Sequence, residues 1–201
     1  HESGQRVCVS CVGVDAQYRS DEVYRFCKPR WPLVRAMKGM GESPRERRER
    51  TEAKTIVGRP SNKGNRYRCN LFPVETDAAK DRIMARLRII APGPGYRHFN
   101  DGLDPEWFEQ MASEKKMRLT HGFIVYWAWR KVRERNEAWD LSVGNLATLY
   151  SMGEPTIKGL GTEVVKLMVK VDPAVAAAPP APKPPPMMRR PRGWVNRYKG
   201  Y

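Results

Sequence analysis

Two acids at the start of an apolar helix pattern have the types and spacing that metal-ion chemistry needs. The stretch KVRERNEAWDLSVGNLATLY, residues 131–150, places Glu137 and Asp140 directly after a basic run. Residues three apart lie on one face of an α-helix, so the two carboxylates face the same side. With Asn136 as the N-cap, Glu137 falls in the first turn, where the helix dipole favours an anion. This position accounts for Glu137 without any ligand, so it is the lesser of the two metal candidates.

Asp140 lies further into the same pattern and has two interpretations. Gly144 and Ala147 leave a small-residue face beside it, and Arg133 and Arg135 precede it. A carboxylate in that setting could bind a metal ion near a phosphate group, or it could form a buried ion pair. Perturbed carboxylates mark functional sites in only a fraction of cases, so the residues alone leave both interpretations open.

A third acid, Asp15, closes the apolar run VCVSCVGV, residues 7–14. A continuous apolar run predicts a buried strand in a sheet covered on both faces. The carboxyl edge of such a sheet is where α/β folds place their sites, and a helix packed there could bring Asp140 toward Asp15. Carboxylates suit Mg²⁺ or Mn²⁺, and two such ions roughly 4 Å apart can stabilise the attacking and leaving oxygens of a phosphodiester displacement. Two acids are too few for a tight two-ion site, so we expect this chain alone to bind metal poorly and to cut DNA slowly or not at all.

Alternating strands and helices are expected to position these acids. A strand over 7–14, a helix over 20–27 and a strand over 33–39 predict a parallel α/β unit. The other predicted elements are a strand over 69–75, a helix over 77–87 capped by Thr76, a helix over 105–117 opened by Asp104, a hairpin over 118–132 turning near His121 and Gly122, and the helix over 137–150.

The charge of the chain points to a polyanionic partner. Its 201 residues carry a net charge of +15, and nucleic acid is the first candidate for such a surplus. A membrane surface is the competing class, but we find no apolar run of transmembrane length and no signal segment. Between Lys28 and Arg68, 13 Lys and Arg stand against 4 Asp and Glu, which predicts a phosphate-contacting loop or a solvated one with a short helix over 45–53. The candidate DNA contacts along the chain are Lys38, Arg45, Arg47, Arg48, Lys80, Arg97, Arg133 and Arg135.

Four cysteines, Cys8, Cys11, Cys27 and Cys69, do not form a disulfide scaffold at this length. Cys8-x-x-Cys11 has the spacing of half a zinc site. Strand residues three apart point to opposite faces, however, and there is no second close Cys or His pair to complete four ligands. We therefore expect reduced thiols of a cytosolic compartment.

The last part of the chain changes character. Residues 172–186 form a Pro/Ala-rich stretch that predicts an extended linker, and residues 187–201 are basic and aromatic without an acid. This terminal peptide is either disordered or a docking peptide that folds on a partner.

Six segments together resemble the large terminase subunit of lambda-type tailed phages. The resemblance covers roughly residues 7–152 and lies in the C-terminal part of that subunit's nuclease domain. The segments are VDAQYRSDEVYRFCKPR, AMKGMG, VETDAAKDRIMARLRI, APGPGYRHF, EWFEQMASEK and RNEAWDLSVGNLA. The resemblance implies an α/β, ribonuclease-H-like nuclease domain over residues 1–152 whose first strands are missing, followed by a disordered Pro-rich C-terminal tail over 153–201.

The resemblance also implies an activity and a set of catalytic residues. The family's nuclease is a hydrolase that cuts concatemeric double-stranded DNA during genome packaging, with Mg²⁺ or Mn²⁺ held by three acidic positions. Asp15 matches the second position and Asp140 the third, and both are the expected catalytic and metal-binding residues. The first position would lie before His1, so the two-ion site is expected only with that upstream acid. The family's usual Asp-Ser-Gly after the strand is Asp15-Ala16-Gln17 here.

The same resemblance implies partners and a location. They are double-stranded DNA, the terminase small subunit, the portal protein of the capsid and an upstream ATPase domain, all in the host cytoplasm, with no membrane. The large subunit's end docks on the portal in such terminases, so Trp194, Arg197 and Tyr198 are the expected docking residues. Two alternatives remain: a non-catalytic basic DNA-binding or packaging-scaffold protein with both acids in ion pairs, and a basic ribosome-associated protein, which explains the charge but not the ordered motifs.

Overall fold

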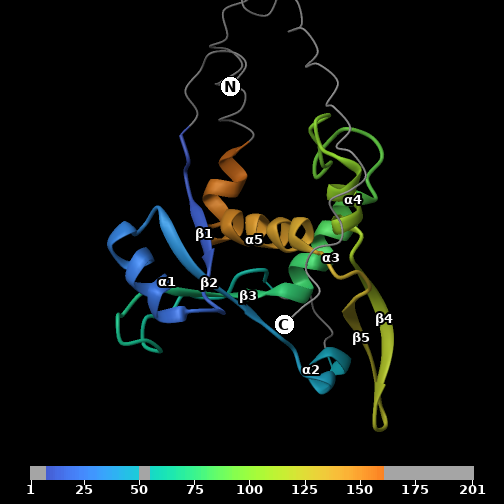
Figure 1. Ribbon diagram of the computed structural model, residues 1–201, viewed down its shortest axis with the longest axis horizontal. Coiled ribbons are helices and arrows are strands. Elements are labelled where there is room, and N and C mark those ends of the chain that lie inside the picture. Colours follow the sequence, from blue (N-terminus) through green and yellow to red (C-terminus); the bar gives the residue numbers. More distant parts are fainter. Residues whose placement is uncertain (1–7, 50–54, 161–201) are drawn as a thin grey trace, which may run out of the picture.

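The computed structural model describes residues 8–49 and 55–160 (Figure 1). Strands β1 (Val12–Asp15), β2 (Val34–Met40) and β3 (Leu71–Glu75) form a parallel sheet in the order β1-β2-β3. Helix α1 (Ser20–Cys27) and the short 3-10 helix η1 (Lys28–Arg30) connect β1 to β2. This confirms the predicted strand-helix-strand unit and the mixed α/β class. The disordered tail predicted over 153–201 was wrong for its first residues, because residues 154–160 are helical. The rest of that tail, including the portal-docking residues, lies outside the described residues.

The first strand differs from its prediction. The apolar run over residues 7–14 was expected to form one buried strand, but only Val12–Asp15 is a strand, and Val9 and Val12 are exposed. The reason is that, among the described residues, β1 is an edge strand that pairs only with β2. Cys8 and Cys11 precede the strand and are free thiols. Asp15 does end the strand, as expected.

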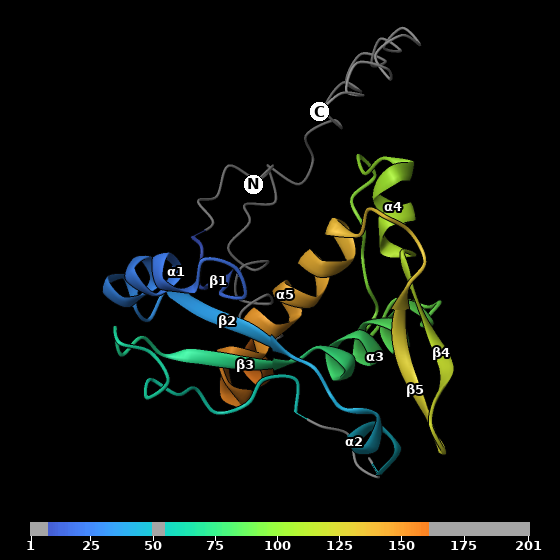
Figure 2. The same cartoon turned by 60° about the horizontal axis from the view of Figure 1, so that its bottom comes forward.

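Helix α5 (Glu137–Ser151) forms the centre of the main core. Trp139 on α5 is fully buried and packs with Ile83 of α3 (Thr76–Leu87) and Phe72 of β3. Further along the helix, β1 lies so close to α5 that a Cβ atom added at Gly13 would stand 2.2 Å from the Oγ1 atom of Thr148. The helix therefore connects the sheet at one end with α3 at the other, which Figure 2 shows from a second direction.

A second, smaller core lies between α1 and the sheet. Tyr24 and Cys27 of α1 pack there with Val34, Ala36 and Cys69. Burial, with a smaller contribution from Cys69, raises the pKa of the Cys27 thiol to about 11, and Arg30 opposes this shift. Both thiols of this core are free in the structure. Among residues 8–49 and 55–160, no group of three or more His, Cys, Asp or Glu side chains is placed to hold a metal ion.

The second half of the chain adds a hairpin to this core. Helix α4 (Pro105–Met111) begins as predicted, because Asp104 accepts a hydrogen bond from the backbone N–H of Trp107 at 2.8 Å. The prediction extended this helix to residue 117, and that was wrong: β4 begins at Glu114 and pairs with β5. The strands β4 (Glu114–His121) and β5 (Ile124–Lys131) are antiparallel and turn at Gly122, whose φ is +58°. Cross-strand pairing has here overridden the helix propensity of Glu, Lys and Met.

In the described part of the basic segment between β2 and β3 lies the short helix α2 (Pro44–Glu49), which overlaps the short helix expected over 45–53. It contacts β5 of the hairpin. None of the helices in the described part of the chain is long and apolar enough to cross a membrane.

Candidate active site

Asp15 lies at the carboxyl edge of the parallel sheet, in a turn that is hydrogen-bonded to the neighbouring strand. Its Oδ1 atom accepts a hydrogen bond from the backbone N–H of Gln17 at 3.0 Å. The side chain of Gln17 donates to the carbonyl of Gly39 on β2 at 3.2 Å, and the Ser20 hydroxyl donates to the carbonyl of Ala16 at 2.7 Å. The Asp15-Ala16-Gln17 sequence thus forms a defined turn that leaves Asp15 exposed to solvent.

A second carboxylate, Glu75, ends β3 at the same edge. It stands opposite Met40 in the register of β2 and β3, while Asp15 stands opposite Met37. The hydroxyl of the next residue, Thr76, donates to the carbonyl of Met40 at 3.3 Å and fixes the start of α3 against the end of β2. Glu75 was not among the predicted site residues, although it shares the sequence signal of Asp15, since both acids close a predicted strand.

Asp140 lies in the first turn of α5, and its surroundings disfavour its charge. The pKa of its carboxyl is raised, first by burial of the group and also by the negative charge of Glu114. Lys80, Lys131 and a 2.7 Å hydrogen bond from the Asn136 side chain oppose this shift. The residue as a whole is still exposed, so its carboxylate lies at the surface but is partly shielded from water by the surrounding protein.

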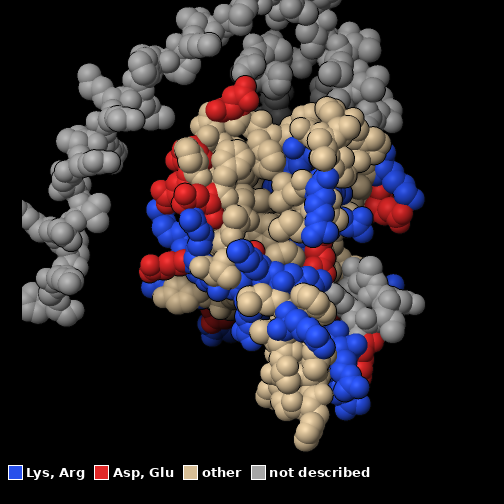
Figure 3. All heavy atoms as spheres, turned by 90° about the vertical axis from the view of Figure 1, so that its right-hand side faces the viewer, with Lys and Arg blue, Asp and Glu red and all other residues tan. Residues whose placement is uncertain are grey.

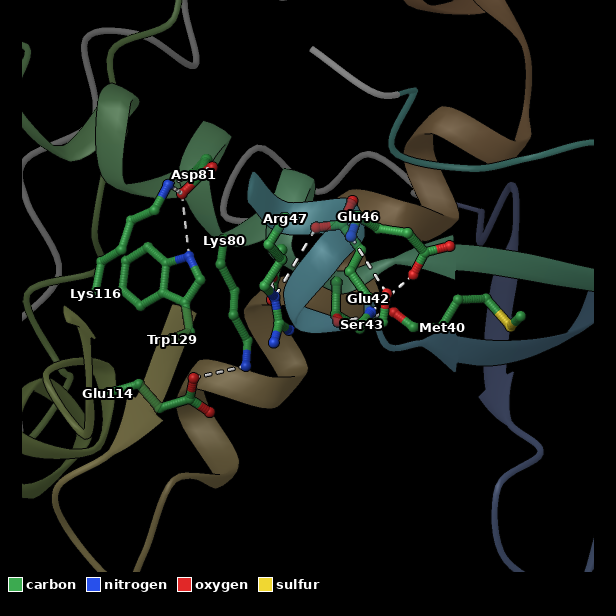
Figure 4. A network of polar contacts seen from close by, with 12 residues as sticks. Met40, Glu42, Ser43, Glu46, Arg47, Lys80, Asp81, Glu114, Lys116 and Trp129 are labelled. Atoms are coloured by element: carbon green, nitrogen blue, oxygen red, sulfur yellow. Dashed lines mark hydrogen bonds and ion pairs between the residues drawn. The ribbon is translucent and has the colours of Figure 1, made fainter. Parts of the chain in front are cut away.

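Next to Asp140 is a buried ion pair. The Nζ atom of Lys80 on α3 lies 2.6 Å from Oε2 of Glu114 at the start of β4, and the side chains are only 14% and 8% exposed (Figure 4). Lys80 and Glu114 both act electrostatically on Asp140, so the three groups form one neighbourhood built from α3, β4 and α5. Glu114 was missed in the sequence because it was assigned to the interior of a helix.

A second polar cluster connects the same elements (Figure 4). Asp81, one residue after Lys80, accepts hydrogen bonds from Lys116 Nζ at 2.7 Å and from the indole N–H of Trp129 at 3.0 Å. The ring of Trp129 stacks at a tilt on Trp139, with centroids 5.5 Å apart. The base of the hairpin is therefore fixed to both α3 and α5.

Comparison with known proteins decides the family to which this arrangement belongs. Residues 1–158 match the family model described as terminase large subunit gpA, endonuclease domain. The chain belongs to this terminase endonuclease family. No match was found among curated proteins or among solved structures. The resemblance inferred from the six sequence segments is thus confirmed, and the family supports a nuclease role in phage DNA packaging.

Within this terminase endonuclease domain, Asp140 lies in the first turn of α5, whereas the strand that ends at Asp15 contacts the helix nearer its other end. β1 contacts the helix at Thr148, eight residues after Asp140, which is roughly 12 Å along a helix that rises about 1.5 Å per residue. Figure 1 shows β1 crossing α5 toward the C-terminal end of the helix. No hydrogen bond in the described part of the domain joins Asp15 and Asp140.

The predicted DNA contacts divide into two groups. The side chains of Lys38 and Arg48 are exposed and make no hydrogen bond or ion pair among the described residues. The side chain of Arg45 is also exposed, and its ion pair is with Glu49 on the same helix. The other five are held by partners in the protein: Arg47 by Asp77 at 2.7 Å, Lys80 by Glu114, Arg97 by Ser142 at 3.0 Å, Arg133 by Glu109 at 2.6 Å, and Arg135 by Glu106. For Arg47 and Lys80, which are also poorly exposed, this geometry favours a structural role over phosphate binding.

Arg133 and Arg135 contribute to an open pocket of about 370 Å³ between α4 and the segment before α5. Its other lining residues are Glu106, Glu109, Gln110 and Glu134. Glu137 is near this pocket through its 3.8 Å ion pair with Arg135. Because acids and arginines neutralise each other there, the pocket has neither the charge for DNA nor a set of free carboxylates for a metal ion.

Proposed function

We propose that this terminase endonuclease domain binds double-stranded DNA and cuts it, with Mg²⁺ or Mn²⁺, during genome packaging. The observation that carries the proposal is the family match over residues 1–158. It is supported by Asp15 at the carboxyl edge of a parallel sheet, the position where α/β folds place their sites, and by a net charge of +15. A ribonuclease-H-like fold is part of this proposal.

Asp15 and Asp140 are the proposed catalytic and metal-binding residues, with Glu137 as a lesser candidate because Arg135 already neutralises it. By themselves these residues do not fit a two-ion site. β1, which ends at Asp15, contacts α5 at Thr148, eight residues beyond Asp140, and no three metal-ligating side chains gather within residues 8–49 and 55–160. Glu75, at the same sheet edge as Asp15, is the described carboxylate best placed to add to this site.

The proposed partners follow from the family. They are the terminase small subunit, the portal protein and an ATPase domain of the large subunit, in the host cytoplasm. Trp194, Arg197 and Tyr198 remain the proposed portal-docking residues, and they lie outside the described residues.

A cleavage assay on supercoiled plasmid tests the catalytic proposal. The chain, joined to its ATPase domain, is incubated with plasmid and with Mg²⁺, Mn²⁺ or EDTA, and the expected result is metal-dependent conversion to nicked and linear forms. Asp15→Asn and Asp140→Asn should each abolish cutting. Asp101→Asn is the matched control, because Asp101 is exposed in a loop and has no partner among the described residues. Full cutting by Asp140→Asn would remove that residue from the site.

A second candidate function is non-catalytic DNA binding or scaffolding. It is favoured by the contact of β1 with α5 at Thr148, eight residues beyond Asp140, because a nuclease site needs Asp15 and Asp140 in one cleft. Under this alternative, the protein binds plasmid with the same salt sensitivity but leaves it supercoiled in every metal condition, and Asp15→Asn and Asp140→Asn have no effect on binding.

A further inference from the structure

The β4–β5 hairpin is an arm that is fixed at its base and extends away from the domain. Its eight antiparallel residue pairs run from Glu114 and Lys131 at the base to His121 and Ile124 at the tip. At about 3.4 Å per residue, such a strand reaches some 25 Å. The base is held by the Lys80–Glu114 pair and by Asp81. Helix α2 contacts β5, and Figure 1 shows the tip of the hairpin projecting beyond that helix.

One face of this arm is open and carries large side chains. Alternate residues of a strand point to opposite faces, so Arg118 and its partner Trp127 share a face with the pair Thr120 and Val125. Trp127 is 56% exposed and Val125 40% exposed. On the opposite face Tyr126 is buried. At the turn, Phe123 follows Gly122 and is completely exposed. We call the set Arg118, Thr120, Phe123, Val125 and Trp127 the ribbon face.

The charge around the ribbon face has one sign. Residues 114–131 contain five Lys and Arg but a single acid, Glu114, which is buried in its pair with Lys80. The side chains of Lys115, Arg118 and Arg130 make no hydrogen bond or ion pair within the described part of the chain. Arg118 lies on the ribbon face, whereas Lys115 and Arg130 stand opposite each other on the other face, near the base. Figure 3 shows a projection at the bottom of the view that is mostly free of charged side chains, with Lys and Arg gathered above it. Exposed aromatic side chains next to an unpaired arginine can bind a partner that carries both phosphate groups and planar bases.

We propose that the ribbon face binds in a groove of double-stranded DNA, with Phe123 inserted as a wedge at a base step. The major groove is wide enough for a two-stranded β-ribbon. Arg118, the unpaired cation of the ribbon face, contacts a phosphate on the groove wall, and this contact carries no sequence information. An apolar side chain that enters a base step unstacks it and bends the duplex.

This inference rests on the proposed function, because it takes duplex DNA as the substrate. It adds the element that binds the duplex and the effect of that binding on the position of the duplex. Since Glu114 begins β4 and also pairs with Lys80 beside Asp140, the arm that grips the duplex is fixed to the same elements that hold the candidate catalytic acid. The ribbon therefore sets where the duplex lies relative to Asp140.

Two binding measurements on the 201-residue chain test the inference. The first is fluorescence anisotropy with a random-sequence duplex, using Phe123→Ser, Trp127→Ser and Arg118→Ala. The matched controls are Ile90→Ser, another almost fully exposed apolar residue, and Arg25→Ala, an exposed arginine on α1. Stacking on a base predicts a loss of affinity of roughly 5- to 100-fold for Phe123→Ser. Trp127→Ser removes the largest exposed side chain of the ribbon face and should also weaken binding. Arg118→Ala should reduce the slope of log K against log salt by about 0.9. The controls should bind as the unchanged chain does.

The second measurement uses a duplex containing 2-aminopurine, whose fluorescence rises when its base step unstacks. The unchanged chain should raise this signal and Phe123→Ser should not, while circular dichroism confirms that both are folded. If the unchanged chain binds duplex DNA but the aromatic variants bind equally well, the ribbon inference is wrong and the proposed function stands. If the unchanged chain does not bind duplex DNA at all, the proposed function fails first. If the variants lose affinity only for another packaging protein, the hairpin is a protein-docking arm and the inference is also wrong.

Discussion

At the scale of one residue, the negative charge of Asp140 does not stabilise the folded state. Burial and Glu114 raise the pKa of its carboxyl, so the folded protein favours the neutral form. A raised acid pKa gives a contribution to stability that is complete below the unfolded pKa and is lost as the pH rises through the folded pKa. At neutral pH the ionised carboxylate is therefore unfavourable for folding, which is understandable if a cation is to be bound there.

The first prediction concerns this residue. Asp140→Asn keeps the size of the side chain and removes the unfavourable charge, so we expect a Tm at pH 7 equal to or above that of the unchanged protein. The difference should shrink below the ordinary pKa of Asp, where both side chains are neutral. Thermal unfolding followed by circular dichroism at the two pH values measures this. A variant that is less stable at pH 7, with Asp101→Asn unaffected, would show that the carboxylate is a structural group.

At the scale of elements, α3 and β4 are joined by the ion pair of Lys80 and Glu114, and the sequence had suggested Lys80 as a DNA contact. Lys80 was selected from the sequence as a phosphate ligand, but its Nζ atom faces Glu114 and only 14% of its side chain is exposed. Removing one partner of a buried pair leaves the other charge uncompensated, at a cost of about 3–5 kcal/mol. Replacing both partners by apolar residues of similar volume is often close to neutral.

The second prediction uses that asymmetry. Lys80→Met should lower the free energy of unfolding by about 3–5 kcal/mol, and Lys80→Met combined with Glu114→Leu should recover most of the loss. Urea unfolding measures both variants. If Lys80→Met leaves stability unchanged and instead weakens DNA binding, the side chain leaves its partner in solution and the original interpretation as a DNA contact is restored.

A comparison of the elements shows which parts of the fold could be predicted from the sequence. Helices α3 and α5 and the turn at Gly122 were predictable, because local periodicity and a turn residue specify them. The exposure of β1 and the early end of α4 were not, since each depends on which strand pairs with which. The same dependence hid Glu114, whereas Asp15 was found because the end of a strand is visible in the sequence.

For the whole molecule, the net charge of +15 predicts binding to DNA that weakens steeply with salt. The structure distinguishes exposed from internally paired cations, which gives a third prediction. Lys38→Ala and Arg48→Ala should each lower the slope of log K against log salt by about 0.9, because both side chains are exposed and have no partner among the described residues. Arg47→Ala should leave the slope unchanged and reduce stability instead, since Arg47 pairs with Asp77. Equal slopes for all three variants would contradict this division.

The last prediction extends to the C-terminal peptide, residues 187–201, which lies outside the described residues. Arginine and aromatic residues most often anchor protein interfaces, and this peptide pairs them. Deleting Met187–Tyr201 should abolish association with portal-bearing capsids in a pull-down and leave duplex affinity nearly unchanged. A sharp fall in DNA affinity with intact portal binding would instead identify the peptide as an electrostatic arm.

The contact between β2 and the end of α5 has a consequence for how the protein is made. Arg35 on β2 donates a hydrogen bond to the Ser151 hydroxyl at 3.0 Å across 116 residues of sequence. A ribosome adding about 5–20 residues per second needs roughly 6–23 s to cover that interval. During this time β1 and β2 have been synthesised, while α5, which packs against β1, does not yet exist. The nascent sheet is therefore exposed to chaperones and to other nascent chains, and the domain completes its fold only when translation of this region is nearly finished.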